Sequence, residues 1–89
     1  MLEVTVIIVH EVGLHARPAS MFVQTAAEYS SDIEVTHGEV TTNAKSILGV
    51  LTLGAHKGAE IIIKAEGEDA EEALKALEQL VLANFSEDE

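Results

Sequence analysis

Residues 13–19 read Gly13-Leu14-His15-Ala16-Arg17-Pro18-Ala19, and they mark the change from a strand to a helix. Proline fits only the first turn of a helix, because it lacks the backbone N–H that later turns need. We therefore expect a helix that begins between Leu14 and Arg17. Its buried face is expected at the i, i+3, i+4 and i+7 positions, which are Ala19, Phe22, Val23 and Ala26.

The segment before this junction alternates between apolar and polar residues, which predicts a β-strand over residues 2–9. One face carries Leu2, Val4, Val6 and Ile8. Ile7 and Val9 interrupt the polar face. We therefore expect this strand to be central in its sheet, or to be covered near its end.

The rest of the chain predicts three more strands and a final helix. Short β runs at residues 33–35 and 39–42 flank a hairpin turn at His37-Gly38, and residues 60–66 form the last strand. Asp69 is expected to cap the last helix in a capping box with the glutamate three residues later. With a short helix before the last strand, the order is β-α-β-β-α-β-α. This predicts an α+β protein whose helices cover one face of a four-stranded sheet.

The short helix is expected over residues 47–53, because Ser46 is a good N-cap and Gly54 a good C-terminal stop. Its large apolar residues are Ile47, Leu48, Val50, Leu51 and Leu53. A helix of two turns can bury only one stripe, so we expect Val50 and Leu53 in the core. The other three must be at least partly exposed and mark a docking surface, unless a flanking loop covers them.

Composition sets the class of protein. The chain has 89 residues with 47% hydrophobic content, which predicts a single domain over residues 1–89. It has no cysteine, so no disulfide or thiolate site is expected. Five cations against 16 acids give a net charge of −11, which disfavours nucleic acid and anionic membranes as partners. No apolar stretch approaches the length of a membrane span, so we expect a cytoplasmic protein.

The acids are unevenly distributed. Residues 12–27 and 40–59 contain none, although they hold the cations Arg17, Lys45 and Lys57. If these two windows are neighbours in space, they form a neutral-to-basic face on an acidic protein. Such a face suits a phosphate group or an acidic partner.

His15 is the candidate catalytic residue. A neutral imidazole is a nucleophile near pH 7, and the first turn of a helix favours a bound phosphate. Arg17 can add a charge-assisted contact to phosphate oxygens. A lone histidine beside a helix start is also a common loop residue, and the residues alone leave both interpretations open.

The other histidines, His10, His37 and His56, have no arginine or helix start beside them, so we expect them to be exposed polar residues. No two histidines have the i,i+4 spacing of a helical metal site, and no metal is expected. A metal-binding carrier that uses His15 and His56 is a lower-ranked alternative.

Two segments resemble one family. Residues 13–19 resemble the phosphorylation-site signature of HPr, the small phosphocarrier of the bacterial phosphoenolpyruvate:sugar phosphotransferase system. Residues 43–54, Asn43-Ala44-Lys45-Ser46-Ile47-Leu48-Gly49-Val50-Leu51-Thr52-Leu53-Gly54, resemble its regulatory-serine signature. The resemblance implies an open-faced β-sandwich with a four-stranded antiparallel sheet, in the element order predicted above. Leu48 and Leu51 stand where methionine is common in the family, and Thr52 where serine is common.

The resemblance also implies a function. His15 would accept phosphate from phosphorylated enzyme I through Nδ1, Arg17 would stabilise it, and enzyme IIA domains would receive it. The protein would then be a carrier that forms a phosphohistidine, without a cofactor, rather than a free-standing catalyst. Ser46 would be phosphorylated by an ATP-dependent HPr kinase/phosphorylase. The implied partner-binding residues are Ser20, Met21, Gln24, Ile47, Leu48 and Leu51. An alternative is a regulatory HPr-like module that acts through Ser46 on a transcription regulator.

Overall fold

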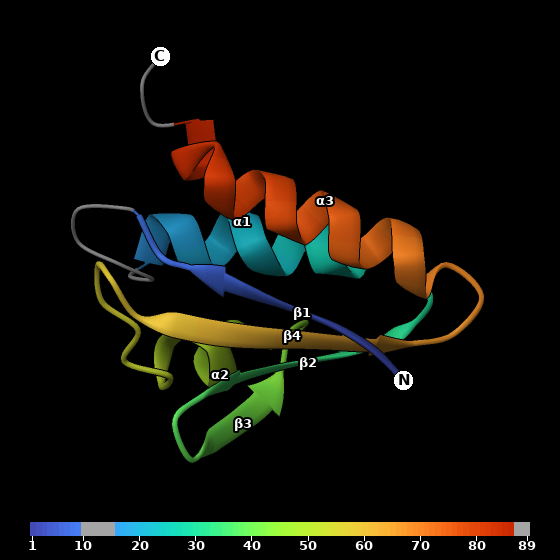
Figure 1. Cartoon of the computed structure of the whole chain (residues 1–89), viewed down its shortest axis with the longest axis horizontal. Coiled ribbons are helices and arrows are strands. Elements are labelled where there is room, and N and C mark those ends of the chain that lie inside the picture. The colour runs from blue at the N-terminus through green and yellow to red at the C-terminus, as the bar shows by residue number, and fades with distance from the viewer. Residues whose placement is uncertain (10–15, 87–89) are drawn as a thin grey trace.

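The computed structural model describes residues 1–9 and 16–86, and it has the predicted order of strands and helices (Figure 1). The elements are β1 (Leu2–Ile7), α1 (Ala16–Ala27), β2 (Asp32–His37), β3 (Val40–Asn43), α2 (Ile47–Leu51), β4 (Glu60–Glu66), α3 (Ala70–Leu82) and a 3₁₀ turn, η1 (Asn84–Ser86). The α+β class predicted from the sequence is confirmed. Among the described residues, no helix is long and apolar enough to cross a membrane.

The four strands form one antiparallel sheet in the order β1-β4-β2-β3, so β4 lies between β1 and β2. Ile63 of β4 pairs with Val4 on one side and with Val35 on the other. The burial of β4 alternates: Ile61, Ile63 and Ala65 are buried, whereas Ile62 and Lys64 are partly exposed. This alternation is that of a sheet covered by helices on one face and open on the other.

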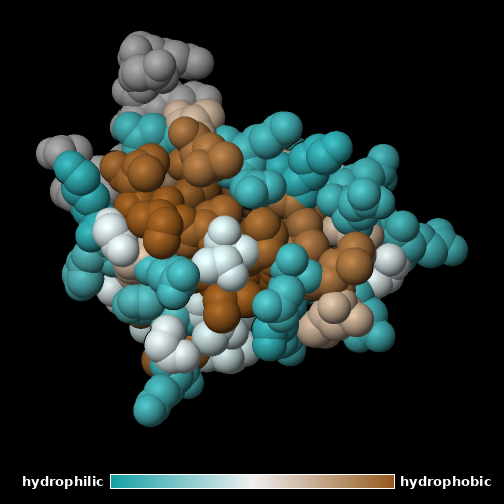
Figure 2. Space-filling model, in the orientation of Figure 1, coloured by the Kyte–Doolittle hydropathy of each residue, from teal (hydrophilic) through white to brown (hydrophobic). Residues whose placement is uncertain are grey.

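β1 differs from its prediction, because it is an edge strand with β4 as its one partner in the sheet. Ile7 and Val9, which suggested a covered or central strand, are 45% and 42% exposed. Figure 2 shows apolar side chains gathered on this side of the molecule, over β1 and α3, where Leu82 is also exposed. The prediction was wrong because apolar residues on the outer face of a strand do not require a cover.

Three of the four residues predicted for the buried face of the first helix lie in the core, and the fourth, Val23, is half-buried. Ala19, Phe22 and Ala26 of α1 are buried, and Leu77 of α3 is fully buried among them in one apolar cluster. The second large aromatic residue of the core, Phe85, comes from η1, where it has a positive φ of 55°. The chain therefore turns back at the end of α3 and places this ring inside.

Asp69 stands at the N-cap position of α3, but its side chain makes no capping bond. Its carboxylate instead accepts the N–H of Ser30 at 2.9 Å, the N–H of Ser31 at 3.0 Å and the hydroxyl of Ser31. The predicted capping box is wrong, because these donors from the turn after α1 take the carboxylate. Asp69 thereby connects that turn to the start of α3.

Replacing Asp69 with asparagine is expected to lower the melting temperature at pH 7. The pKa of Asp69 is lowered, first by the Ser31 hydroxyl and then by the Ser30 N–H. A depressed carboxyl pKa stabilises the fold above the pKa of the unfolded chain, and this contribution is lost as the pH falls through the folded pKa. Thermal melts from pH 7 to pH 2 should show the gap between wild type and Asp69→Asn closing on the acid side. Asp32→Asn, at an exposed aspartate, is the control. A gap that stays constant with pH would contradict the role given to this carboxylate.

Candidate functional site

α1 begins at Ala16, the residue that follows His15 in the chain. His15 itself lies outside the described residues, so the structure gives the helix end next to this histidine and not the ring. Pro18 occupies the first turn of α1, as predicted, and is fully buried. The first N–H groups of a helix have no acceptors within the helix and carry partial positive charge. This end of α1 can therefore stabilise an anion next to His15.

The predicted site residues of α1 lie along its surface, from the first turn to the second half of the helix. Arg17 is exposed in the first turn. Gln24 is exposed one turn after Ser20, and its Nε2 donates a hydrogen bond to Ser20 Oγ at 3.2 Å. Met21 is half-buried and packs against the core. Ser20 and Gln24 thus offer polar groups to a partner, whereas Met21 offers only part of its side chain.

α2 presents the apolar residues that the sequence predicted to be exposed. Leu48 is 74% exposed, Ile47 39% and Leu51 38%, whereas Val50 is fully buried. Since α1 and α2 pack against each other, these residues lie on a surface next to that of α1. We call Ser20, Met21, Gln24, Ile47, Leu48 and Leu51 together the α1–α2 surface.

Ser46 is the N-cap of α2, as predicted. Its Oγ accepts the N–H of Gly49 at 3.1 Å, and its backbone is extended. Beyond the other end, where Thr52 is the C-cap, Gly54 has a positive φ of 64°, which suits glycine and turns the chain away from the helix. The helix itself covers only Ile47–Leu51, shorter than the predicted two turns.

Side chains outside α2 attach it at both ends. Lys45, just before the N-cap, donates from Nζ to the carbonyl of Tyr29 at 2.7 Å, beyond the last turn of α1. His37, at the end of β2, lies with Nδ1 2.8 Å from the carbonyl oxygen of Leu53. The prediction that His37 is an exposed polar residue is wrong, since its ring is half-buried and hydrogen-bonded; His56 is exposed, as predicted.

The middle of α2 lies very close to β3. A Cβ atom added at Gly49 would collide with the hydroxyl of Thr42, and it would lie 3.1 Å from the Cβ of Thr42. Only a residue without a side chain allows this approach. The glycine in the middle of a short helix, normally unfavourable, therefore has a packing reason.

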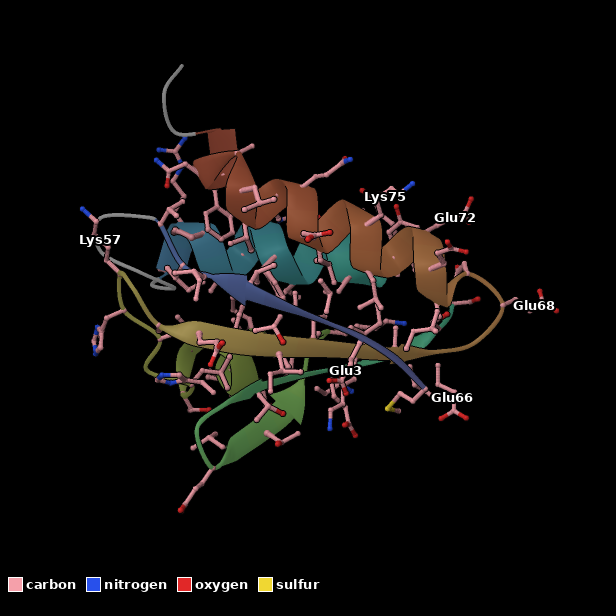
Figure 3. The ribbon with its side chains drawn as sticks, in the orientation of Figure 1. Glu3, Lys57, Glu66, Glu68, Glu72 and Lys75 are labelled. Atoms are coloured by element: carbon pink, nitrogen blue, oxygen red, sulfur yellow. The ribbon has the colours of Figure 1, made fainter. Side chains whose placement is uncertain are left out.

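The acid-free windows of the sequence are neighbours in the structure. α1 lies in the first window and α2 in the second, and the two helices pack together. Figure 3 shows Lys57 at one end of the long axis of the molecule, and the acids Glu66, Glu68 and Glu72 towards the other end. The α1–α2 surface is thus a region without carboxylates on a protein of net charge −11.

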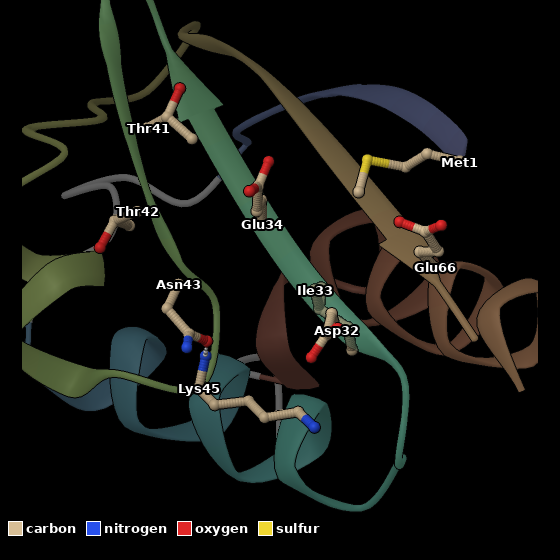
Figure 4. A pocket seen from close by; sticks show the side chains of 9 residues that line it. All are labelled: Met1, Asp32, Ile33, Glu34, Thr41, Thr42, Asn43, Lys45 and Glu66. Carbon is tan, nitrogen blue, oxygen red and sulfur yellow. Dashed lines mark hydrogen bonds between the residues drawn. The ribbon is translucent and has the colours of Figure 1, made fainter.

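A pocket of about 470 Å³ lies on β2, β3 and the end of β4 (Figure 4). Asp32, Glu34 and Glu66 line it, together with Lys45, whose Nζ is bound to the carbonyl of Tyr29. Three carboxylates disfavour phosphate, so this pocket is no rival to the α1 end as a phosphoryl site. Among the described residues, no group of three or more histidines or acids is placed to hold a metal ion.

Comparison with known proteins identifies relatives along almost the whole chain. A family model described as the PTS HPr component phosphorylation site matches residues 2–83. The crystal structure of HPr-C-His from Thermoanaerobacter tengcongensis is 49% identical, with a TM-score of 0.95 and 98% of each chain covered.

Two further solved structures extend the comparison. Phosphocarrier protein HPr from Bacillus anthracis is 44% identical, with a TM-score of 0.87 over 90% of this chain and 95% of that one. The Bacillus subtilis catabolite repression protein Crh, described as a swapped dimer, is 38% identical, with a TM-score of 0.71 over 98% of this chain and 95% of that one. The relatives thus include both phosphocarriers and a regulatory protein.

Replacing Gly49 with alanine is expected to destabilise the fold by about 1–3 kcal/mol, because the new methyl group overlaps the Thr42 side chain. Urea unfolding measures the change. The double variant Gly49→Ala/Thr42→Ala, compared with Thr42→Ala alone, should recover most of the loss because it removes the hydroxyl. Equal stability of Gly49→Ala and wild type would show that α2 can move off β3 without cost.

Proposed function

The chain belongs to the HPr family of phosphocarriers of the phosphotransferase system, and from that premise we propose that His15 accepts a phosphoryl group from phosphorylated enzyme I and passes it to enzyme IIA domains in sugar uptake. The observation that carries this proposal is the start of α1 at Ala16, directly after His15. The positive end of the helix and the exposed Arg17 in its first turn supply stabilisation for a phosphoryl group there.

The proposed chemistry is two in-line transfers. The lone pair of His15 Nδ1 attacks phosphorus, the bond from phosphorus to the donor protein breaks, and a new P–N bond forms. In the second transfer the acceptor attacks the same phosphorus, and His15 leaves with the electron pair of the P–N bond. Positioning and electrostatic stabilisation dominate such transfers. One arginine and one helix end stabilise the phosphoryl group on His15, but not so strongly that its transfer to the acceptor is prevented.

The α1–α2 surface is the proposed docking site for both partners. Leu48 gives it a prominent apolar centre, and Ile47 and Leu51 extend it. Ser20 and Gln24 provide hydrogen-bonding groups on the adjoining helix. Exposed apolar area of this kind, rimmed by polar groups, is typical of protein interaction sites.

We also propose that Ser46 is a regulatory phosphorylation site for an ATP-dependent HPr kinase/phosphorylase. Its Oγ already faces the first N–H groups of α2, where a phosphate finds donors. Lys45 would not neutralise that phosphate, because its Nζ is engaged by the Tyr29 carbonyl. The added negative charge would stand directly beside Ile47 on the docking surface.

A regulatory module is the second candidate function. The similarity to Crh, a catabolite repression protein, favours it. Such a module would act through phosphorylated Ser46 on a transcription regulator. Transfer from His15 to an enzyme IIA domain in a reconstituted mixture distinguishes the two functions.

Incubation with phosphoenolpyruvate and enzyme I is expected to add one phosphate to the intact protein, as measured by mass spectrometry. A P–N bond is labile in acid, so an acid wash should remove the phosphate. His15→Ala should take up none while keeping its fold by circular dichroism. Phosphate uptake by the His15→Ala protein would refute the assignment, and no uptake by the wild type would refute the carrier function with that enzyme I.

Ser46→Asp is expected to slow phosphoryl transfer from enzyme I roughly tenfold or more, because a carboxylate at the docking surface repels an acidic partner. Steady-state kinetics should show most of the loss in KM. Gln79→Glu adds the same single charge on an exposed position of α3 and serves as the control for net charge. Equal rates for Ser46→Asp and wild type would leave Ser46 as a structural cap.

A further inference from the structure

α2 is too short to keep a fixed orientation relative to the sheet without contacts from the rest of the protein. It has five residues, of which only Val50 is buried. Isolated helices below about 12 residues are marginal in water, so the direction of α2 depends on contacts from other elements. Just before α2, Lys45 donates to the carbonyl of Tyr29 beyond α1, whereas the bond of Ser46 to Gly49 lies within the helix and its cap. Just after α2, His37 at the end of β2 makes a hydrogen bond to the carbonyl of Leu53.

The contact of His37 has a defined chemistry. Nδ1 lies 2.8 Å from the carbonyl oxygen of Leu53. A carbonyl can only accept, so Nδ1 must carry the proton. The side chain of Leu53 is buried, and Gly54 turns the chain away with its positive φ. His37 therefore fixes the point at which the chain leaves α2.

We propose that His37 is a positioning residue for partner docking: its Nδ1–H, at the end of β2, holds the chain two residues after the end of α2 and thereby sets the direction in which Leu48 and Leu51 face a partner. This inference rests on the proposed carrier function and deepens it, because it names a residue outside the docking surface that sets the affinity for enzyme I. It gives His37 no part in the chemistry at His15.

The contact does not depend on the charge of the ring. In the neutral ring with Nδ1–H, the other nitrogen Nε2 is an acceptor, and protonation of Nε2 leaves the Nδ1–H in place. His37 therefore acts as a permanent tether. The proposed effect of His37 on docking therefore depends on where the N–H donor lies. This distinguishes it from a pH-dependent switch, whose effect would depend on the charge of the ring.

Four variants test the proposed role of His37 by removing its N–H donor, moving it or keeping it in place, with His56 as the control position. Asparagine carries an N–H donor at the place of Nδ1, whereas glutamine carries it one bond further out. His37→Ala and His37→Gln should raise the KM of enzyme I for this protein roughly three- to tenfold, the effect of losing one hydrogen bond, with kcat unchanged. His37→Asn should restore the wild-type KM. His56→Ala, at an exposed histidine whose side chain has no hydrogen bond within the described residues, is the matched control.

Nitrogen-15 NMR of the imidazole gives a readout that does not need a partner protein. The neutral ring of His37 should be the Nδ1–H tautomer, and the amide resonance of Gly54 should shift in His37→Ala but not in His37→Asn. An Nε2–H tautomer would overturn the inference. So would an equal KM for all four variants, or a loss in kcat that asparagine does not rescue. Wild-type protein that takes no phosphate from enzyme I would refute the proposed function and leave the NMR test of the tether intact.

Discussion

The short helix α2 imposes the constraint on which the proposed docking surface depends. A helix of five residues with one buried side chain gains too little from its own hydrogen bonds to fix a direction. Its position is therefore set by its surroundings: the close approach of Gly49 to Thr42 on β3, the bond of Lys45 just before the helix, and the bond of His37 to the chain just after it. The attachments involve β3, the end of β2 and the turn after α1, and Leu48 remains exposed.

Local sequence signals predicted most of the fold and part of the candidate site. The junction at Pro18 identified the start of α1, because proline restricts the backbone whatever the rest of the chain does. Ser46 identified the start of α2 for the same reason, since capping is a property of a single residue, whereas Gly54 marked a turn three residues beyond the end of the helix at Leu51. The count of apolar residues in α2 also predicted exposure, because one stripe is all that such a helix can bury.

The errors concern choices between distant partners. Asp69 could accept from α3 or from Ser30 and Ser31, which lie nearly forty positions away, and no local pattern indicates the second option. His37 lies within hydrogen-bond distance of the Leu53 carbonyl only because the β2–β3 hairpin and the segment after α2 pack together in the folded protein. The burial of Phe85 was not predicted at all, because it follows from two consecutive residues with positive φ, which few side chains adopt. In each case tertiary contacts decided between local alternatives.

A carrier that exchanges phosphoryl groups with two different proteins needs a surface that each of them can bind and then release. Apolar side chains suit this need, because their burial is non-directional and does not demand the same hydrogen-bonding groups from both partners. Most of the residues that form the α1–α2 surface are apolar. Lys45, a cation that could otherwise bind one partner firmly, donates its hydrogen bond to the carbonyl of Tyr29 within the protein. The carboxylates lie outside α1 and α2, where they do not oppose a phosphorylated donor. A short helix of fixed orientation can thus support transient complexes, because it presents the same surface to each partner without binding either one tightly.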